Sequence, residues 1–113
     1  MSLKELQVEV DSWIQVHGVR YFDVMTNALL LNEEVGELSR LIARKYGQQS
    51  FKNESNAKNV DECIADEIGD ILFVLTCLSN QMEYSLEEIV KNNLNKKTKR
   101  DGQRHHANEK LKN

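Results

Sequence analysis

Two short acidic segments of the chain share one pattern of residue types. Residues 31–38 read LNEEVGEL and residues 64–71 read IADEIGDI. Each is apolar at both ends, with a Glu at its fourth position, a Gly at its sixth and further acids at its third and seventh. Neither segment contains a histidine, and oxygen ligands without nitrogen or sulfur favour a hard cation such as Mg²⁺ or Mn²⁺. The repeated pattern therefore indicates a metal site made of carboxylates.

The spacing determines where these acids lie if both segments are helical. At about 100° per residue, counted from Leu31, residues 34, 37 and 33 fall at about 300°, 240° and 200°, beside an apolar stripe near 0°. The second segment repeats these angles when they are counted from Ile64. The six acids are Glu33, Glu34, Glu37, Asp66, Glu67 and Asp70. Carboxylates so close to a core are unfavourable unless a cation neutralises them.

A solvated acidic helix edge is the simpler interpretation, and it would suffice for either segment alone. The repetition favours the metal site, because Gly36 and Gly69 also occupy matching positions. A glycine inside a helix costs about 1 kcal/mol relative to alanine. We therefore expect the two helices to approach each other closely around the metal.

Four helices are expected to position these acids. A capping box at Ser2 predicts a first helix that ends near Gly18, and a second capping box at Ser85 predicts a last helix that ends near Asp101. Apolar repeats at helical spacing predict two further helices between them, over 26–45 and 61–82. The polar segment 48–58 is expected to be a loop. The predicted fold is an all-α antiparallel four-helix bundle. Its second and third helices are apolar beyond one face, which favours assembly as a homo-oligomer.

The composition excludes several classes of protein. A chain of 113 residues without proline suits one helical domain. It has no apolar stretch of the roughly 20 residues that a membrane span needs, and its first residues do not resemble a signal peptide, so a cytoplasmic protein is expected. Cys63 and Cys77 are expected on one helix about 21 Å apart, too far for a disulfide.

Charge is unevenly distributed along the chain. The net charge is −3, yet residues 96–113 contain seven basic residues and two acidic ones. An acidic body argues against binding to nucleic acid, while the basic end could contact phosphate. We expect a domain over residues 1–104 and a basic, flexible tail over residues 105–113.

The acidic motifs resemble those of a known family. Glu33-Glu34-x-x-Glu37 followed by Glu67-x-x-Asp70 is similar to the E-E-x-x-E … E-x-x-D signature of MazG-like nucleotide pyrophosphohydrolases. The similarity runs from Leu6 to about residue 104, so it covers most of the chain.

The resemblance implies a fold, a reaction and a set of roles. It implies an all-α nucleoside triphosphate pyrophosphatase, homodimeric or homotetrameric, that hydrolyses a (d)NTP to the monophosphate and pyrophosphate. The Mg²⁺ ligands, with Mn²⁺ as a substitute, would be Glu34, Glu37, Glu67 and Asp70. Glu33 would be a further ligand or would orient the attacking water, which makes Glu33 and Glu34 the candidate catalytic residues. The phosphate-binding candidates are Lys96, Arg100 and Arg104.

Other interpretations remain open at this stage. Trp13 is a candidate for stacking on the nucleobase, but its place on an apolar stripe favours a role in the core or an interface. A ferritin-like di-iron protein would need Glu-x-x-His pairs, which neither segment contains. A non-catalytic helical module that binds nucleotides or nucleic acid is the remaining alternative. The sequence does not indicate which base is preferred.

Overall fold

The structure, a computed structural model, describes residues 1–52, 57 and 59–112 and has no β-strand among them. Its long helices are α1 (Leu3–Trp13), α2 (Val24–Tyr46), α4 (Val60–Gln81) and α5 (Leu86–Asp101). Two short helices, η1 (Ile14–Gly18, a π-helix) and η2 (Glu109–Leu111, a 3₁₀-helix), follow α1 and α5. The predicted all-helical class is confirmed. The predicted helix bounds agree within two residues when η1 is counted with α1, which by itself ends five residues before Gly18. Of the expected loop, residues 53–56 and 58 lie outside the described residues.

Side-chain caps start three of the long helices. The Ser2 hydroxyl accepts from the Glu5 N–H (3.0 Å), and the Glu5 carboxylate accepts from the Ser2 N–H (3.2 Å), so the predicted capping box is formed. Asp23 caps α2 by accepting from the Thr26 N–H (2.7 Å). Ser85 accepts from the N–H three residues on (3.3 Å), which begins α5. These bonds satisfy backbone donors that have no partner inside the helix.

The ends of α1 and α2 have different causes. The chain after α1 widens into the π-helix η1 and leaves it at Val19, whose φ of 68° breaks the helical path. Gly47 ends α2 as predicted, but its φ of −94° is not left-handed. A Cβ at Gly47 would lie 2.5 Å from the Ala43 carbonyl oxygen, so the position needs glycine for lack of space.

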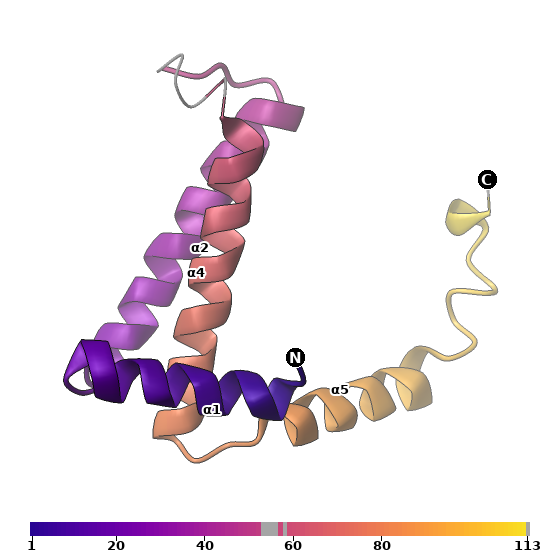
Figure 1. Cartoon of the computed structure of the whole chain (residues 1–113). Helices are drawn as coiled ribbons and strands as arrows, with labels where there is room; N and C mark the ends of the chain where they lie inside the picture. Colours follow the sequence, from indigo (N-terminus) through magenta and orange to yellow (C-terminus); the bar gives the residue numbers. More distant parts are fainter. Residues whose placement is uncertain (53–56, 58, 113) are drawn as a thin grey trace.

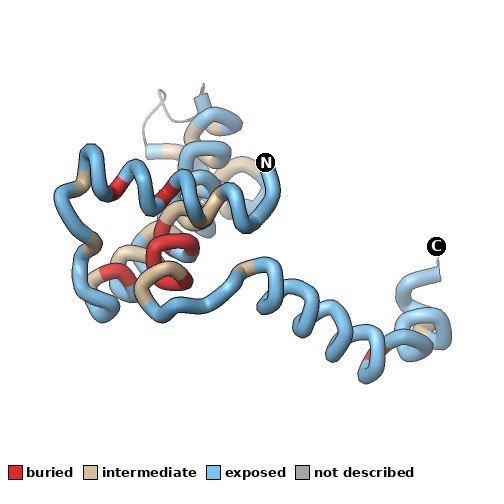
Figure 2. Tube along the Cα trace, turned by 60° about the horizontal axis from the view of Figure 1, so that its bottom comes forward, coloured by how far each residue is buried: buried red, intermediate tan, exposed pale blue. Residues whose placement is uncertain are grey.

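Helices α2 and α4 form an antiparallel pair, and α1 crosses one end of it (Figure 1). The buried core lies at this crossing, as Figure 2 shows, where Val10 of α1 and Ile14 of η1 meet Cys77 of α4. Burial raises the pKa of the Cys77 thiol to about 11. Both cysteines are free, as expected. No helix among the described residues is long and apolar enough to cross a membrane.

The expected closed four-helix bundle does not form within one chain. Helix α5 packs against α1 and extends away from the α2/α4 pair (Figure 1). The radius of gyration is 17.9 Å, whereas a compact domain of this length has about 13 Å. The accessible surface is 8895 Å², compared with about 6,400 Å² for a folded monomer of this mass. The chain is therefore more open than a self-contained domain.

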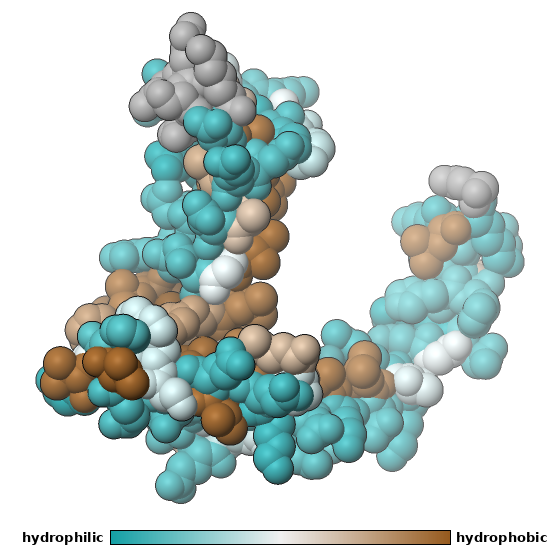
Figure 3. Space-filling view, in the orientation of Figure 1, coloured by the Kyte–Doolittle hydropathy of each residue, from teal (hydrophilic) through white to brown (hydrophobic). Residues whose placement is uncertain are grey.

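Much of the extra exposed surface is apolar. The stripe that the sequence predicts for the core is left partly uncovered on α2 and α4, and Figure 3 shows apolar residues along one side of this pair. We call this surface the open stripe; its members, each at least 40% exposed, are Val35, Ile42, Ile68, Leu72 and Leu75. Helical periodicity places Val35, Ile42, Ile68 and Leu75 on the apolar stripes of their helices, and Leu72 lies beside the stripe of α4.

Candidate metal centre

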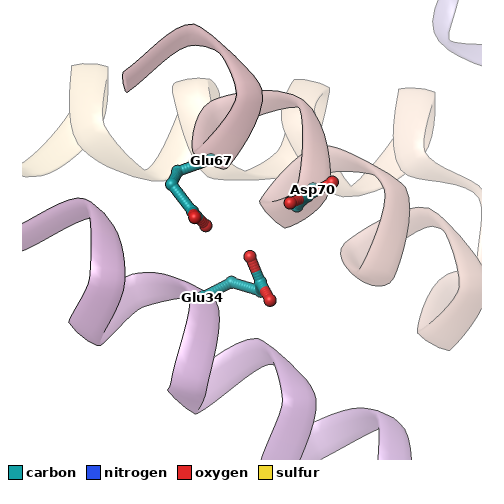
Figure 4. Close-up of side chains that lie close together, drawn as sticks. All are labelled: Glu34, Glu67 and Asp70. Atoms are coloured by element: carbon teal, nitrogen blue, oxygen red, sulfur yellow. The ribbon is translucent and has the colours of Figure 1, made fainter. Parts of the chain in front are cut away.

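The α2/α4 pair brings three of the predicted carboxylates together. Glu34 is on α2, and Glu67 and Asp70 are on α4. One carboxylate oxygen from each of the three lies within 4.8 Å of those of the other two. Figure 4 shows the three side chains converging in the space between the helices. Glu67 and Asp70 share one side of α4 because they are three residues apart. This part of the sequence-based site is therefore assembled within a single chain.

The antiparallel pairing keeps the two acidic segments level with each other. Near the far end of the pair, Lys45 of α2 forms an ion pair with Asp61 in the first turn of α4. Leu41 of α2 and Val74 of α4 are buried along the pair. These contacts hold Glu34 opposite Glu67, so the site depends on the packing of two helices and not on a loop.

Mutual repulsion and partial burial disturb the ionisation of these acids. The pKa of Glu34 is raised, first by a hydrogen bond shared with Glu67 and then by desolvation and the Glu67 charge. The pKa of Asp70 is raised mainly by desolvation, with further contributions from Glu34 and Asp66. Both acids thus hold a proton more tightly than in water, as carboxylates do when they share a site without a cation.

One oxygen of the cluster lacks a partner. Glu67 Oε2 is buried, and no hydrogen-bond donor among the described residues reaches it. A buried charged oxygen without a donor is unfavourable unless a proton or cation compensates it. The oxygen-only donor set suits Mg²⁺ or Mn²⁺. The residues present therefore fit a hard divalent cation bound by Glu34, Glu67 and Asp70.

The structure does not bring the other two predicted acids into the cluster. Glu37 lies one turn along α2 from Glu34, and its carboxylate is ion-paired with Arg40. Both side chains of this pair are about half exposed, at 47% and 48%. Glu33 is exposed on the same helix. Glu37 is thus paired with Arg40 through Oε2 and does not join the three clustered carboxylates.

Trp13 lies at a pocket that reaches the acidic cluster. The indole is half exposed, at 50%, and packs edge-on against Phe73 with ring centroids 5.5 Å apart. A pocket of about 450 Å³ is lined by Leu6, Glu9, Val10, Trp13, Asp70 and Phe73. Trp13 thus lies at the edge of the core and also lines an open pocket next to a candidate metal ligand.

The predicted phosphate-binding residues are not beside the acids within one chain. Lys96 and Arg100 are exposed on α5, and Arg104 lies beyond the end of that helix. Arg100 Nε lies 2.9 Å from Asp101 Oδ2, and Arg104 Nε lies 3.3 Å from Asp101 Oδ1. The Arg100 guanidinium is the main cause of the lowered pKa of Asp101. Since α5 extends away from the α2/α4 pair, these cations do not complete the cluster in the same chain.

The expectation that Gly36 and Gly69 allow close helix approach is wrong for the single chain. A Cβ built at either glycine would meet no atom within 4 Å. Both residues are exposed. The helices meet through their larger side chains, so the two glycines lie on open surface.

Three residues of this region were not identified from the sequence. Arg40 could have been found from its position three residues after Glu37, a spacing that places both side chains on one face of α2. Phe73 could have been found in the same way from Asp70. Glu9 lines the pocket from α1, and no sequence signal indicates which helix crosses the pair at this point.

The fold and this cluster define a class of all-helical proteins with carboxylates gathered between antiparallel helices. Residues 22–105 match the MazG nucleotide pyrophosphohydrolase domain, and the chain belongs to this family. The protein YpjD of Bacillus subtilis (strain 168) is 40% identical over 87 residues, which cover 77% of this chain and 75% of that protein.

Two crystal structures are also similar. One is the Bacillus-conserved MazG protein, a nucleotide pyrophosphohydrolase, with a TM-score of 0.69 and 31% identity over 85% of this chain and 88% of that chain. The other is YpjD from Bacillus subtilis, with a TM-score of 0.68 and 34% identity over 85% of this chain and 94% of that chain. The predicted membership of the MazG-like family is confirmed.

Proposed function

We propose that the protein is a Mg²⁺-dependent nucleoside triphosphate pyrophosphohydrolase that converts a (d)NTP and water to the (d)NMP and pyrophosphate. The observation that carries the proposal is the convergence of Glu34, Glu67 and Asp70 around a buried carboxylate oxygen without a donor. Membership of the MazG family supports the same reaction. A housekeeping role in the cytoplasmic nucleotide pool follows from this activity.

The metal would be held by the three clustered carboxylates, and Glu37 would join them once it leaves Arg40. Bound there, Mg²⁺ or Mn²⁺ would supply charge neutralisation for the triphosphate and a lower pKa for a coordinated water. The closeness of the three carboxylates supports the ligand set, because it creates a strong negative field at one point between the helices.

Glu34, a member of the cluster, and Glu33, the exposed acid before it on α2, would also act on the attacking water. Its oxygen attacks the α-phosphorus, and the bond between that phosphorus and the α–β bridging oxygen breaks. Glu33 and Glu34 would orient the water and accept its proton, and pyrophosphate leaves with the bridging oxygen. No covalent intermediate with the protein is required.

The pocket beside Asp70 would receive the rest of the nucleotide. Trp13 offers a half-exposed aromatic face there, and Phe73 fixes the plane of its ring through their edge-on contact. A nucleobase stacked on Trp13 would lie on the same side of the α2/α4 pair as Asp70, since both residues line one pocket. Trp13 is therefore our proposed base contact.

The phosphate-binding cations would come from a second copy of the chain. Lys96, Arg100 and Arg104 lie away from the acids of their own chain, and α5 exposes apolar residues as well, including Leu94 at 57%. The chain exposes about 2,500 Å² more than a compact monomer, a quantity typical of obligate interfaces. We propose a homodimer or homotetramer in which the open stripe is covered by another copy.

Pyrophosphate release tests the proposed reaction. Each dNTP and NTP is incubated with the purified protein and Mg²⁺, in parallel with a Glu67→Gln, Asp70→Asn variant. The matched control is Glu62→Gln, which changes an exposed acid in the first turn of α4, outside the cluster. We expect release by the parent and the control but not by the double variant.

The same experiment separates the enzyme from the binding module. Absence of release with every nucleotide and both metals would refute the enzymatic proposal. Binding of nucleotide without release would then favour a regulatory module built on the same helices.

A further inference from the structure

The turn between α4 and α5 is held by one side chain of α1. The Gln7 amide nitrogen donates to Asn80 Oδ1 (2.9 Å) and to the Tyr84 carbonyl (2.8 Å). Its amide oxygen accepts from the N–H of Leu86 (2.9 Å), the first residue of α5. Gln7 therefore connects the end of α4, the turn and the start of α5. We call these contacts the Gln7 latch.

The latch is supported from both sides. The Asn80 amide nitrogen donates to the Gln7 carbonyl (3.0 Å) and to the Tyr21 hydroxyl (3.0 Å), and that hydroxyl donates to Asp11 (2.7 Å). Gln7 and Asn80 are only partly exposed. A side chain that uses both its donors and its acceptor oxygen in this way has a defined orientation.

Local backbone bonds close the turn, since the Tyr84 N–H donates to the Ser79 carbonyl (2.8 Å) and the Glu83 N–H donates to the Asn80 carbonyl (3.2 Å). Glu83 has a φ of 59°, in the left-handed region that non-glycine residues rarely adopt. Ser85 satisfies the N–H of Glu88 and leaves that of Leu86 to Gln7. The first N–H of α5 thus has its partner on a third helix, and this contact ties the start of α5 to α1.

Within its own chain, helix α5 has few other contacts that fix its direction. Among the long helices it packs against α1, and Ile89, Val90 and Leu94 remain at least 40% exposed. Lys96 and Arg100 lie about 15 Å and 21 Å along the helix axis from Leu86. A rotation of about 10° at the latch would therefore move Arg100 by about 4 Å, and phosphate contacts tolerate much smaller errors.

We propose that Gln7 is a positioning residue for substrate binding: it sets the direction of α5 and thereby places Lys96 and Arg100 on the triphosphate. The inference rests on the proposed function. Trp13 lies on the same helix as Gln7, six residues on. Helix α1 would thus place the base contact in the site of its own chain and, through Gln7, the cations in the site of the second copy. The contacts of Gln7 are with the turn and not with the substrate, so its effect on binding is indirect.

A double-mutant cycle tests this coupling. Gln7→Met keeps the length of the side chain and removes its hydrogen bonds, while Gln7→Glu keeps an acceptor for the Leu86 N–H. The control is Gln15→Met, at an exposed glutamine of η1. If Gln7 acts through the cations, Gln7→Met raises KM about tenfold in the parent and has little effect in a Lys96→Ala, Arg100→Ala background. Gln7→Glu should fall between parent and Gln7→Met.

The same double-mutant cycle is measured with the affinity for inorganic tripolyphosphate, determined by calorimetry. This readout requires no turnover. If the protein does not hydrolyse nucleotides, the parent releases no pyrophosphate. The cycle measured on tripolyphosphate binding still tests the role of Gln7 in that case. Equal losses of affinity for Gln7→Met in both backgrounds would overturn the proposal, because they would show that Gln7 acts independently of the cations.

Spin labels measure the direction of α5 directly. Labels at Asn32→Cys on α2 and Asn93→Cys on α5, both exposed positions, are introduced in a Cys63→Ser background and diluted with unlabelled chains. We expect a narrow distance distribution in the parent and in Gln15→Met, and a broad or displaced one in Gln7→Met. An unchanged distribution in Gln7→Met would also overturn the proposal. Thermal melting confirms that each variant is folded.

Discussion

Glu34 and Glu67 face each other across the α2/α4 pair and share a hydrogen bond that raises the pKa of Glu34. In the same cluster, Glu67 Oε2 is buried without a hydrogen-bond partner among the described residues. Two neighbouring carboxylates repel each other when both are ionised, so without a metal they are favourable only if they share a proton. The pair therefore links the stability of the fold to both pH and metal.

Stability without metal is expected to fall as pH rises through the raised pKa values of Glu34 and Asp70. In the folded chain the pKa values of Glu34 and Asp70 lie above their ordinary values of 4.5 and 3.8, so both acids bind protons more tightly than in the unfolded chain. Their stabilising contribution is complete below those ordinary values and is lost as pH rises through the raised pKa values. Thermal melting in EDTA checks this, with Glu34→Gln expected to flatten the dependence. Stability that is independent of pH over this window would contradict the shared proton.

Metal should reverse that loss above the raised pKa values. Mn²⁺ at 100 times its Kd would add about 2.7 kcal/mol to the free energy of unfolding. The melting temperature of the parent and of Glu62→Gln should rise accordingly, and that of Glu67→Gln should not. An equal rise in all three proteins would mean that the ion binds elsewhere.

Replacement of Arg40 should tighten metal binding. Arg40→Gln releases the Glu37 carboxylate, which then becomes available to the cation, so the Kd for Mn²⁺ should fall severalfold. The melting temperature without metal should change little, because an exposed ion pair contributes less than about 1 kcal/mol. Lys91→Gln, which breaks an ion pair of similar exposure on α5, is the control and should leave the Kd unchanged. A weaker affinity in Arg40→Gln would argue against Glu37 as a ligand.

Gly36 and Gly69, the glycines of the two acidic segments, provide a test of the space around them. A Cβ at Gly36 or Gly69 meets nothing within 4 Å, so Gly36→Ala and Gly69→Ala should each stabilise the chain by about 1 kcal/mol through helix propensity. Thermal or urea unfolding measures the change. Destabilisation at either position would indicate that a second copy or a substrate occupies this space.

The open stripe should control assembly. Leu72 is 50% exposed in the single chain, so Leu72→Asp would be tolerated in a monomer but would place a charge inside an apolar interface. We expect sedimentation to show smaller particles and pyrophosphate release to fall at least tenfold. Leu111→Asp, at an exposed apolar residue of η2, should change neither property. A Leu72→Asp variant that assembles like the parent would exclude the open stripe as the interface.

The sequence predicts the local parts of this structure well, for physical reasons. Ser2 with Glu5, and Ser85 with Glu88, identify helix starts because caps act within one turn. Helical periodicity predicts that each acidic segment lines one side of its helix beside the core. The resemblance to the MazG-like signature implies that Glu34, Glu67 and Asp70 share one site, and the structure brings these three together.

The remaining features depend on interactions that sequence periodicity does not encode. The departure of α5 depends on the latch formed by Gln7, a contact between residues almost 80 positions apart. The ion pair of Glu37 with Arg40 competes with the predicted metal ligation, and a ligand signature does not reveal such competition. Gly36 and Gly69 appear in the sequence as packing positions, although the single chain leaves them open.

The small core at the crossing of α1 and α4 has a consequence for the protein in the cell. So few buried apolar residues give an isolated chain little free energy of folding, so folding and association should occur as one event. Newly made chains would remain vulnerable to proteases until they meet a partner. The amount of assembled protein would then rise more steeply than the amount of chain synthesised, and expression level would act as a threshold for assembly.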